Sequence, residues 1–455
     1  MDFFRKKGID ALIEEESNLK KCLTAFDLIF FGVGAVIGAG IFVLTGIVAA
    51  IHAGPAVVFS YMIAGLACTF AALSYAELAS TIGGCGSAYG YAYAGFGELI
   101  AWIVGWDLLL EYAISVSAVS VGWGGYAADF LKTIHLPLPH LLRYSPAQGG
   151  VMNILPVFII MFLTMLLILG VKSSSRVNNL MVAIKLLVIL LFIVIACGNI
   201  QVANWLPFMP FGWAGVFKGA SLIFFAYIGF DAVSTAAEEA VNSQRDLPIG
   251  IIGSLIICTL LYIIVAGLLT GIAHYSSLNV ASPISHALLA LGYKTAAGVI
   301  SIGAIAGLTT VMLVLFYGLT RVLLAMSRDG LLPKAMSKTS TVGRTPARII
   351  LLCGTIMALL AAFISLDVLT ELVNVGTLFA FIIVCVGVLY LRYKHPKLHR
   401  PFKTPGMPYI PILGALSCFY LMISLPWLTL LRFILWMLIG LIVYFAYSCT
   451  HSDLA

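Results

Sequence analysis

Long apolar runs alternate with short polar stretches along almost the whole chain of 455 residues. Each run is close to the roughly 20 residues that an α-helix needs to cross the hydrocarbon core of a membrane. Because charged residues are rare within the runs, each one predicts a membrane-spanning helix. The twelve predicted spans cover residues 26–50, 55–80, 98–128, 153–171, 179–199, 214–238, 249–273, 296–326, 348–364, 367–391, 409–426 and 430–448.

Two of these spans, the first and the sixth, are interrupted in the middle. The first contains residues 32–42 (GVGAVIGAGIF), with four glycines in an apolar run, and the sixth contains residues 224–231 (FFAYIGFD), with a glycine and a carboxylate. Lipid offers no hydrogen bonds to backbone groups, so an unwound segment is tolerated only where it is buried in protein or lines a cavity. Both interruptions are therefore candidate binding sites.

The interrupted spans begin two units of five spans, residues 26–199 and 214–392. Five is odd, so the second unit must be inverted relative to the first. Interrupted segments at corresponding positions of two halves are the best sequence pointer to the binding site of a transporter. The rest of the chain is predicted as a cytoplasmic segment, residues 1–25, and a peripheral pair of spans, residues 409–448.

The chemistry of two broken helices suits a zwitterion. One half-helix end presents free N–H groups and another presents free carbonyls, so backbone can meet both the carboxylate and the amino group of an amino acid. The alternative is that the glycines only pack two helices together, as small residues often do in membranes. A dinucleotide-binding fingerprint would need a preceding strand, which the apolar run does not provide.

Composition and charge describe the same class of protein. Hydrophobic residues make up 62% of the chain, charged residues 10%, and the mean hydropathy is +1.08, which indicates a polytopic membrane protein. With the N-terminus inside, 18 of the 25 basic residues fall in predicted cytoplasmic segments, which satisfies the positive-inside rule. The basic residues therefore report topology, and we predict a plasma-membrane protein with cytoplasmic termini and no nucleic-acid partner.

No catalytic or metal-binding pattern accompanies the spans. The nine cysteines are scattered singly, and the eight histidines fall in predicted loops without the spacing of metal ligands. No serine sits in a Gly-x-Ser-x-Gly turn. We predict neither an enzyme nor a cofactor or metal.

Few ionisable residues fall well inside the spans, and each is a functional hypothesis because burial of a charge there is costly. Lys185 lies about two turns inside the cytoplasmic end of span five. Burial disfavours the charged form of a lysine, so Lys185 could exchange a proton near neutral pH and couple transport to protons. The alternatives are a permanently charged pin to the carbonyls of span one, or a side chain that snorkels to the interface.

The buried carboxylates are also open to two interpretations. Asp231 follows the break of span six, and could meet a substrate amine through water or cap the freed N–H groups of the next half-helix. Asp107 and Glu111 are four residues apart in span three and share a helix face. Arg321 is close enough to the inner end of span eight to snorkel, so we assign it no chemistry.

Several motifs together resemble a known family. Residues 32–42 and 225–231 are similar to its first-span and sixth-span signatures, and residues 242–251 (NSQRDLPIGI), 327–333 (SRDGLLP) and 400–406 (RPFKTPG) match its cytoplasmic motifs. The chain resembles the amino acid-polyamine-organocation superfamily, and within it bacterial relatives of the cationic amino acid transporters. The similarity runs from about Leu19 to Tyr447. Ser243 departs from the proline that the family usually has there.

The resemblance implies an all-α fold with twelve spans, the leucine-transporter fold, built as a 5+5 inverted repeat plus two peripheral helices, with helices 1 and 6 unwound. It also implies site residues. The amides of Ala39, Gly40 and Ile41 would hold the substrate carboxylate, and the carbonyls of Phe225, Ala226 and Ile228 would hold its amine. Further pocket residues on spans three, six and eight would be Glu111, Asp231, Met312 and Leu315.

The coupling ion is left open by the resemblance. In the subfamily, the lysine that matches Lys185 places its ammonium where sodium-driven relatives bind a cation between spans one and eight. Thr309 and Thr310 could complete an ion site, so sodium is not excluded.

The predicted function is a proton-coupled importer of small neutral or cationic L-amino acids that works by alternating access. The rivals are an amino acid exchanger and a non-transporting amino acid receptor or regulatory subunit. Glu111 and Asp231 favour cationic side chains, whereas Met312 and Leu315 favour small neutral ones. The sequence leaves open the oligomeric state, bound membrane lipid and a small accessory membrane subunit.

Overall fold

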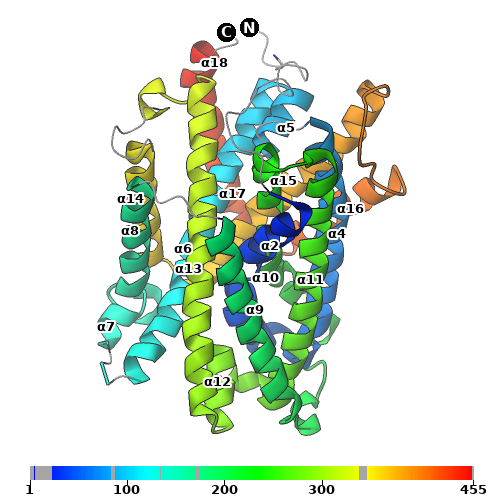
Figure 1. Cartoon of the computed structure of the whole chain (residues 1–455). Coiled ribbons are helices and arrows are strands. Elements are labelled where there is room, and N and C mark those ends of the chain that lie inside the picture. The colour runs from blue at the N-terminus through cyan, green and yellow to red at the C-terminus, as the bar shows by residue number, and fades with distance from the viewer. Residues whose placement is uncertain are drawn as a thin grey trace.

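The computed structural model describes residues 5, 23–82, 88–133, 135–136, 138–169, 175–337 and 346–452 (Figure 1). Most of them belong to helices, and the β-bridge found among them is an isolated pair, Leu23 with Ala240. Of the predicted cytoplasmic segment, residues 1–25, the structure describes Arg5 and residues 23–25 alone. The prediction of an all-α membrane protein is confirmed.

Eight helical stretches among the described residues are long and apolar enough to cross a membrane: Gly40–Ile82, Glu98–Lys132, Asn179–Cys197, Gly212–Ser234, Ser243–Ile272, Lys294–Arg328, Leu366–Lys394 and Trp427–His451. Four shorter apolar helices lie on other predicted spans: α2 (Ala25–Val36), α8 (Ile154–Ile168), α14 (Ala347–Phe363) and α16 (Tyr409–Ile423). Long and short helices together overlap every predicted span.

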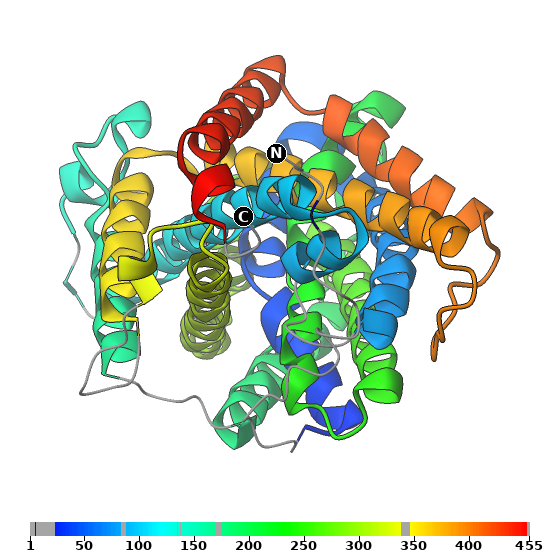
Figure 2. The same ribbon diagram turned by 90° about the horizontal axis from the view of Figure 1, so that it is seen from above.

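The long stretches contain the helices that build the body of the protein. These are α4 (Val57–Ile82), α6 (Glu98–Thr133), α9 (Ser175–Cys197), α10 (Gly212–Ile223), α11 (Ser243–Ile272), α13 (Lys294–Arg328), α15 (Leu366–Lys394) and α17 (Trp427–Val443). Seen from above, α16 and α17 lie at the outer edge (Figure 2). Burial agrees, since 83% of the most apolar window in residues 212–234 is buried but only 22% of that in residues 427–451.

The helical stretches differ from the predicted spans in two ways. The second half of span one continues into α4 through a π-helical turn, η2 (Ala49–Ala53), and a 3-10 turn, η3 (Gly54–Ala56), so no extended loop separates spans one and two. Gly54 makes this bend at φ +63°, a conformation that L side chains rarely adopt. Short helices also appear between spans, α5 (Ala88–Gly95), α7 (His140–Arg143) and α12 (Pro283–Ala290), because half-polar runs of this length give no spanning pattern.

Helix α5 is tied to the end of α13 that carries the motif at residues 327–333. The hydroxyl of Tyr89 donates a hydrogen bond to Oδ2 of Asp329 at 2.6 Å. Burial raises the pKa of the Tyr89 hydroxyl well above its usual value, so it is the donor of this bond. The motif at residues 327–333 thus anchors the helix between spans two and three.

Candidate functional site at two broken helices

The break in span one lies where the glycines predict it. Helix α2 begins at a Thr24 cap and ends at Val36, and Ile37 is extended at φ −72° and ψ 98°. The chain resumes as a π-helical turn, η1 (Gly40–Leu44), followed by α3 (Thr45–Val48). The break therefore leaves a carbonyl end at α2 and an N–H end at η1, facing along the same span.

The break in span six has a related form. Helix α10 tightens into a 3-10 turn, η6 (Phe224–Tyr227), and Ile228 is extended at ψ 133°. Gly229 has φ +117°, which needs glycine, and the chain continues as a second 3-10 stretch, η7 (Asp231–Glu239). Both interrupted spans are thus unwound at the predicted residues.

The two breaks touch each other. A Cβ added to Gly40 would lie 2.3 Å from the Cβ of Ala226, and one added to Gly229 would lie 2.9 Å from the carbonyl carbon of Ala35. Real Cβ atoms do not approach so closely, so glycine at both positions lets the broken segments pack backbone to backbone. The structure brings Gly40 and Ala226, one from each half of the predicted site, into contact.

Hydroxyl groups from other helices satisfy the carbonyls of the break in span one. The Tyr262 hydroxyl lies 2.8 Å from the Val36 oxygen and 2.7 Å from the Ala226 oxygen, so it joins the two breaks. Tyr126 donates to the Phe42 oxygen at 2.7 Å, and the Tyr61 hydroxyl lies 3.2 Å from the Gly40 oxygen. An unpaired carbonyl in this water-poor interior would cost several kcal/mol, which these bonds avoid.

Carbonyls of span six differ in how far they are already used. The Phe225 oxygen accepts from the Ile228 N–H at 3.3 Å, and the Ala226 oxygen lies against Tyr262. For the Ile228 oxygen, no partner is found among the residues that the structure describes. Of the three carbonyls predicted to meet a substrate amine, that of Ile228 is the most available.

Lys185 reaches the break from α9. Its Nζ donates to the Gly34 oxygen at 2.7 Å and to the Ile37 oxygen at 3.1 Å, and the side chain is fully buried. On the other side, a Cβ added to Gly307 of α13 would lie 2.9 Å from the Lys185 Cγ, so this glycine makes room for the lysine. The ammonium thus sits at the carbonyl end of α2, between spans one and eight.

Asp231 is held within the break of span six. Its Oδ1 accepts from the Gly229 N–H at 3.2 Å, and its Oδ2 accepts from the Tyr112 hydroxyl at 3.4 Å. Tyr112 follows Glu111 directly in α6, so its bond to Asp231 places Asp231 against the part of α6 that carries Glu111. The two alternatives for Asp231, a backbone cap and a partner for the substrate amine, therefore stay compatible. Its carboxyl group accepts from a backbone N–H of the break and is buried near a second acidic residue, Glu111.

Asp107 and Glu111 are buried in α6 with unsatisfied oxygens. Neither oxygen of Asp107, nor Oε1 of Glu111, has a hydrogen-bond partner in the described part of the chain. A Cβ added to Gly376 of α15 would lie 2.8 Å from the Asp107 Oδ1, so this carboxyl group packs against α15. Asp107 therefore faces α15 rather than the broken segments.

The predicted residues of span eight lie on α13. Met312 and Leu315 are buried, and their neighbour Val311 lies against the break, since its Cγ2 would be 3.3 Å from a Cβ added to Gly38. The Thr309 hydroxyl accepts from Trp123 at 3.0 Å, and Thr310 donates to the Gly307 oxygen at 2.8 Å. Among the described residues, no three or more His, Cys, Asp or Glu are grouped so as to hold a metal ion.

Sequence reasoning missed the tyrosines that hold the breaks and the valine that faces Gly38. A signal for the tyrosines was available, because a hydroxyl in the middle of an apolar span needs a partner. Tyr61, Tyr126 and Tyr262 all lie within predicted apolar spans, Tyr262 near the middle of its span, and all three are buried. Which carbonyl each one meets depends on packing between distant spans, and no local pattern encodes it.

Comparison with known proteins agrees with this geometry. The family model described as amino acid permease matches residues 23–448. The chain is 51% identical to the branched-chain amino acid permease BcaP of Bacillus subtilis, over 99% of this chain and 98% of that protein. It is 47% identical to the methylthioribose transporter of the same organism, over 99% and 98%.

A plant relative extends the comparison. The vacuolar cationic amino acid transporter 4 of Arabidopsis thaliana is 41% identical over 86% of this chain and 67% of that protein. The predicted resemblance, the membrane location and the assignment as a transporter rather than an enzyme are confirmed by these matches. The chain belongs to the amino acid permease family of the amino acid-polyamine-organocation superfamily.

Proposed function

We propose that this permease imports a neutral aliphatic L-amino acid together with a proton, by alternating access in the plasma membrane, with both termini in the cytoplasm. The observation that carries the proposal is the contact of Lys185 Nζ with the Gly34 and Ile37 oxygens at the end of α2. The carbonyl end of a helix is negative, so an ammonium stabilises it. Loss of the proton would remove the charge and weaken that hold.

The inner end of α2 would be the part that moves. Asp27, in the first turn of α2, accepts a hydrogen bond from Asn179 Nδ2 at 2.9 Å. The Val241 N–H donates to the Leu23 oxygen at 2.9 Å. These bonds tie the start of span one to α9 and to the segment after η7. Deprotonation of Lys185 would loosen α2 at its far end, so that these ties open and the substrate leaves inward.

The substrate would bridge the two breaks. The N–H groups of Ala39, Gly40 and Ile41 would receive its carboxylate, and the Ile228 carbonyl, with those of Phe225 and Ala226 beside it, would receive its ammonium. This arrangement uses the N–H end of η1 and, beyond η6, the carbonyl of Ile228, which is the least used of the three. Binding would order both segments and favour closure.

The side chain of the substrate would face apolar groups. Val311 lies against Gly38, and Met312 and Leu315 are buried on the same helix. Both carboxyl oxygens of Asp231 already accept hydrogen bonds, from Gly229 and Tyr112, so Asp231 does not need a cationic substrate side chain as a partner. The BcaP relative is named for branched-chain amino acids, which fits this lining.

Substrate choice is tested by a thermal-shift screen of the purified protein against the twenty amino acids. A ligand raises the unfolding temperature according to its affinity, so leucine, isoleucine or valine should give the largest shift. If lysine or arginine gives the largest shift, the acidic residues dominate and the aliphatic assignment is wrong.

Proton coupling is tested by uptake into proteoliposomes with an imposed pH gradient. The parent protein should accumulate substrate when the outside is acidic, and Lys185→Ala should lose that response. If uptake by Lys185→Ala follows the pH gradient as in the parent, the coupling role is wrong. Sodium coupling predicts instead that a sodium gradient drives uptake and that Thr309→Ala and Thr310→Ala abolish it.

Vesicle loading separates import from exchange. An importer fills empty vesicles, whereas an obligate exchanger is silent until amino acid is loaded inside. A receptor or regulatory subunit would bind substrate in the thermal-shift screen and show no flux with either kind of vesicle.

A further inference from the structure

A groove opens at the end of α11 that the predicted topology places on the cytoplasmic side. It lies between the first turns of α11 and the loop that follows α15, and its volume is about 640 Å³. The polar end is formed by Asn242, Gln244 and Arg245, and the apolar end continues along α11 past Ile249, Ile252 and Ile256. The groove is therefore polar at one end and apolar along its length.

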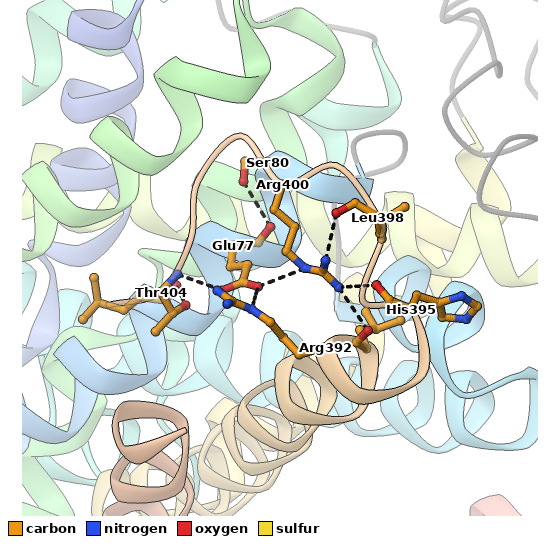
Figure 3. Close-up of polar contacts among 9 residues, drawn as sticks. Glu77, Ser80, Arg392, His395, Leu398, Arg400 and Thr404 are labelled. Atoms are coloured by element: carbon orange, nitrogen blue, oxygen red, sulfur yellow. Dashed lines mark hydrogen bonds and ion pairs between the residues drawn. The ribbon is translucent and has the colours of Figure 1, made fainter. Parts of the chain in front are cut away.

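The opposite wall, Pro401 and Phe402, is fixed by a buried charge cluster (Figure 3). The carboxylate of Glu77 on α4 meets Arg392 Nε at 2.7 Å and Nη2 at 2.9 Å, and lies 3.3 Å from Arg400 Nε.

The same carboxylate also accepts from the Thr404 N–H at 2.8 Å. Arg400 in turn donates to the Leu398, Leu391 and His395 oxygens at 2.8 to 3.0 Å. Because Arg400 and Thr404 flank Pro401 and Phe402, this wall is bound to α4 on both sides. The groove is thus a built feature of the fold.

Arg245 supplies an unneutralised cation at the polar end. Its side chain is exposed, and within the part of the chain that the structure describes its guanidinium makes no ion pair or hydrogen bond. A guanidinium matches the geometry of a phosphate group and binds it with two parallel hydrogen bonds.

The isoleucines supply the apolar part. Ile249, Ile252 and Ile256 are three and four residues apart, so they share one face of α11. Ile249 is 38% exposed and Ile256 is 54% exposed. This face runs from Arg245 into the membrane, along the direction in which an acyl chain would extend.

We propose that the groove binds one anionic phospholipid of the cytoplasmic leaflet. Its phosphate pairs with Arg245, and an acyl chain follows Ile249, Ile252 and Ile256 against Phe402. Basic pockets on the cytoplasmic side of membrane proteins bind acidic lipid headgroups in this way. The lipid joins α11 to the loop that Glu77 holds on α4, so it stabilises the inner ends of two spans together.

Thermal unfolding of the full chain in neutral detergent tests this site. Phosphatidylglycerol should raise the unfolding temperature more than phosphatidylcholine of the same chain length. In Arg245→Gln, the apparent affinity for phosphatidylglycerol should fall about five-fold, the effect of one basic residue beside a headgroup. Arg348→Gln is the matched control, because Arg348 is an exposed arginine in the first turn of α14 and does not line the groove.

Two further arms keep the result interpretable. Arg245→Lys should retain part of the preference for phosphatidylglycerol, and Phe402→Ala should weaken the binding of that lipid, which covers the case in which Arg245→Gln does not fold. The proposal is overturned if Arg245→Gln binds phosphatidylglycerol like the parent, or if Arg348→Gln loses binding equally. It is also overturned if inorganic phosphate gives the same stabilisation, since the site would then recognise the anion alone.

Discussion

Two buried charges show opposite ways of being stabilised. Lys185 is fully buried and donates to two neutral carbonyls, whereas Glu77 is 2% exposed and meets two arginines and a backbone N–H. A buried ion that is paired cannot lose its charge without stranding its partners. Lys185 can release a proton and still donate hydrogen bonds to the Gly34 and Ile37 oxygens as a neutral amine.

Only one of these two buried groups can change its charge without breaking an ion pair. The Glu77 cluster fixes α4 to the end of α15 and to the following loop, and this structural role requires Glu77 to stay charged. Lys185 sits beside an unwound segment, and among the described residues it forms no ion pair that would hold its proton. Loss of either side chain should therefore have distinct effects, on stability for Glu77 and on coupling for Lys185.

Glu77→Gln should give the largest loss of stability. Removing one member of a buried ion pair typically costs 3–5 kcal/mol, so we expect about 3 kcal/mol, near the lower end, because the Arg392 side chain is 26% exposed. Unfolding in mixed micelles measures this. Molecules that still fold should keep the parent's uptake response to a pH gradient, and a loss below about 1 kcal/mol would mean that the cluster behaves like a surface pair.

Lys185→Met should cost less stability and change the response to pH. Methionine has a similar length but no donor, so the Gly34 and Ile37 oxygens lose their partner, at a cost of about 1–3 kcal/mol. Uptake driven by a pH gradient should fall at least about ten-fold, which corresponds to 1.4 kcal/mol. A variant that is destabilised yet equally responsive to pH would place Lys185 in the same structural class as Glu77.

Tyr262→Phe removes a neutral donor from the same helix end. The Val36 and Ala226 oxygens lose a shared hydroxyl, so the unfolding free energy should fall by about 0.5–1.5 kcal/mol. The pH response of uptake should be unchanged, because no charge is removed. Should Tyr262→Phe alter that response as Lys185→Met does, then any loosening of α2 produces the effect and proton release from Lys185 is not needed to explain it.

Arg143→Gln tests an ion pair in which both side chains, rather than one, are partly exposed. Arg143 Nη2 lies 2.8 Å from the Asp129 Oδ1, with side chains 26% and 34% exposed, and Ser282 also donates to Asp129. Exposed pairs contribute about 0.2–1 kcal/mol and weaken with added salt. Unfolding at low and high salt should show a small, salt-dependent loss here, and a loss as large as that of Glu77→Gln would remove the distinction between buried and exposed pairs.

Much of the fold follows from the sequence, because a membrane limits what a backbone can do. A run of about 20 apolar residues has few choices other than a helix, and glycines within such a run mark the break that the structure has at residues 37–39. The short helix α5 was not predicted, since eight half-polar residues carry no spanning pattern.

The tertiary partners were beyond the sequence. Glu77 and Arg392 are 315 residues apart, and nothing local to either residue names the other. The contact of Lys185 with span one was one of several alternatives, and the choice depends on how α9 and Gly307 of α13 pack around it. The local sequence pattern thus predicts the helices, while the contacts within the site depend on which helix faces pack together.

The close approach of Gly40 to Ala226 constrains how this permease can diversify. A side chain at position 40 would collide with both the Cβ and the Cα of Ala226, so replacing Ala226 by glycine would not make room for it. A substitution of Gly40 therefore cannot be compensated by a smaller residue at position 226, where the two breaks cross. Directed evolution toward new substrates should therefore select substitutions on α13 around Val311, whereas Gly40 and Ala226 should stay unchanged in the functional variants.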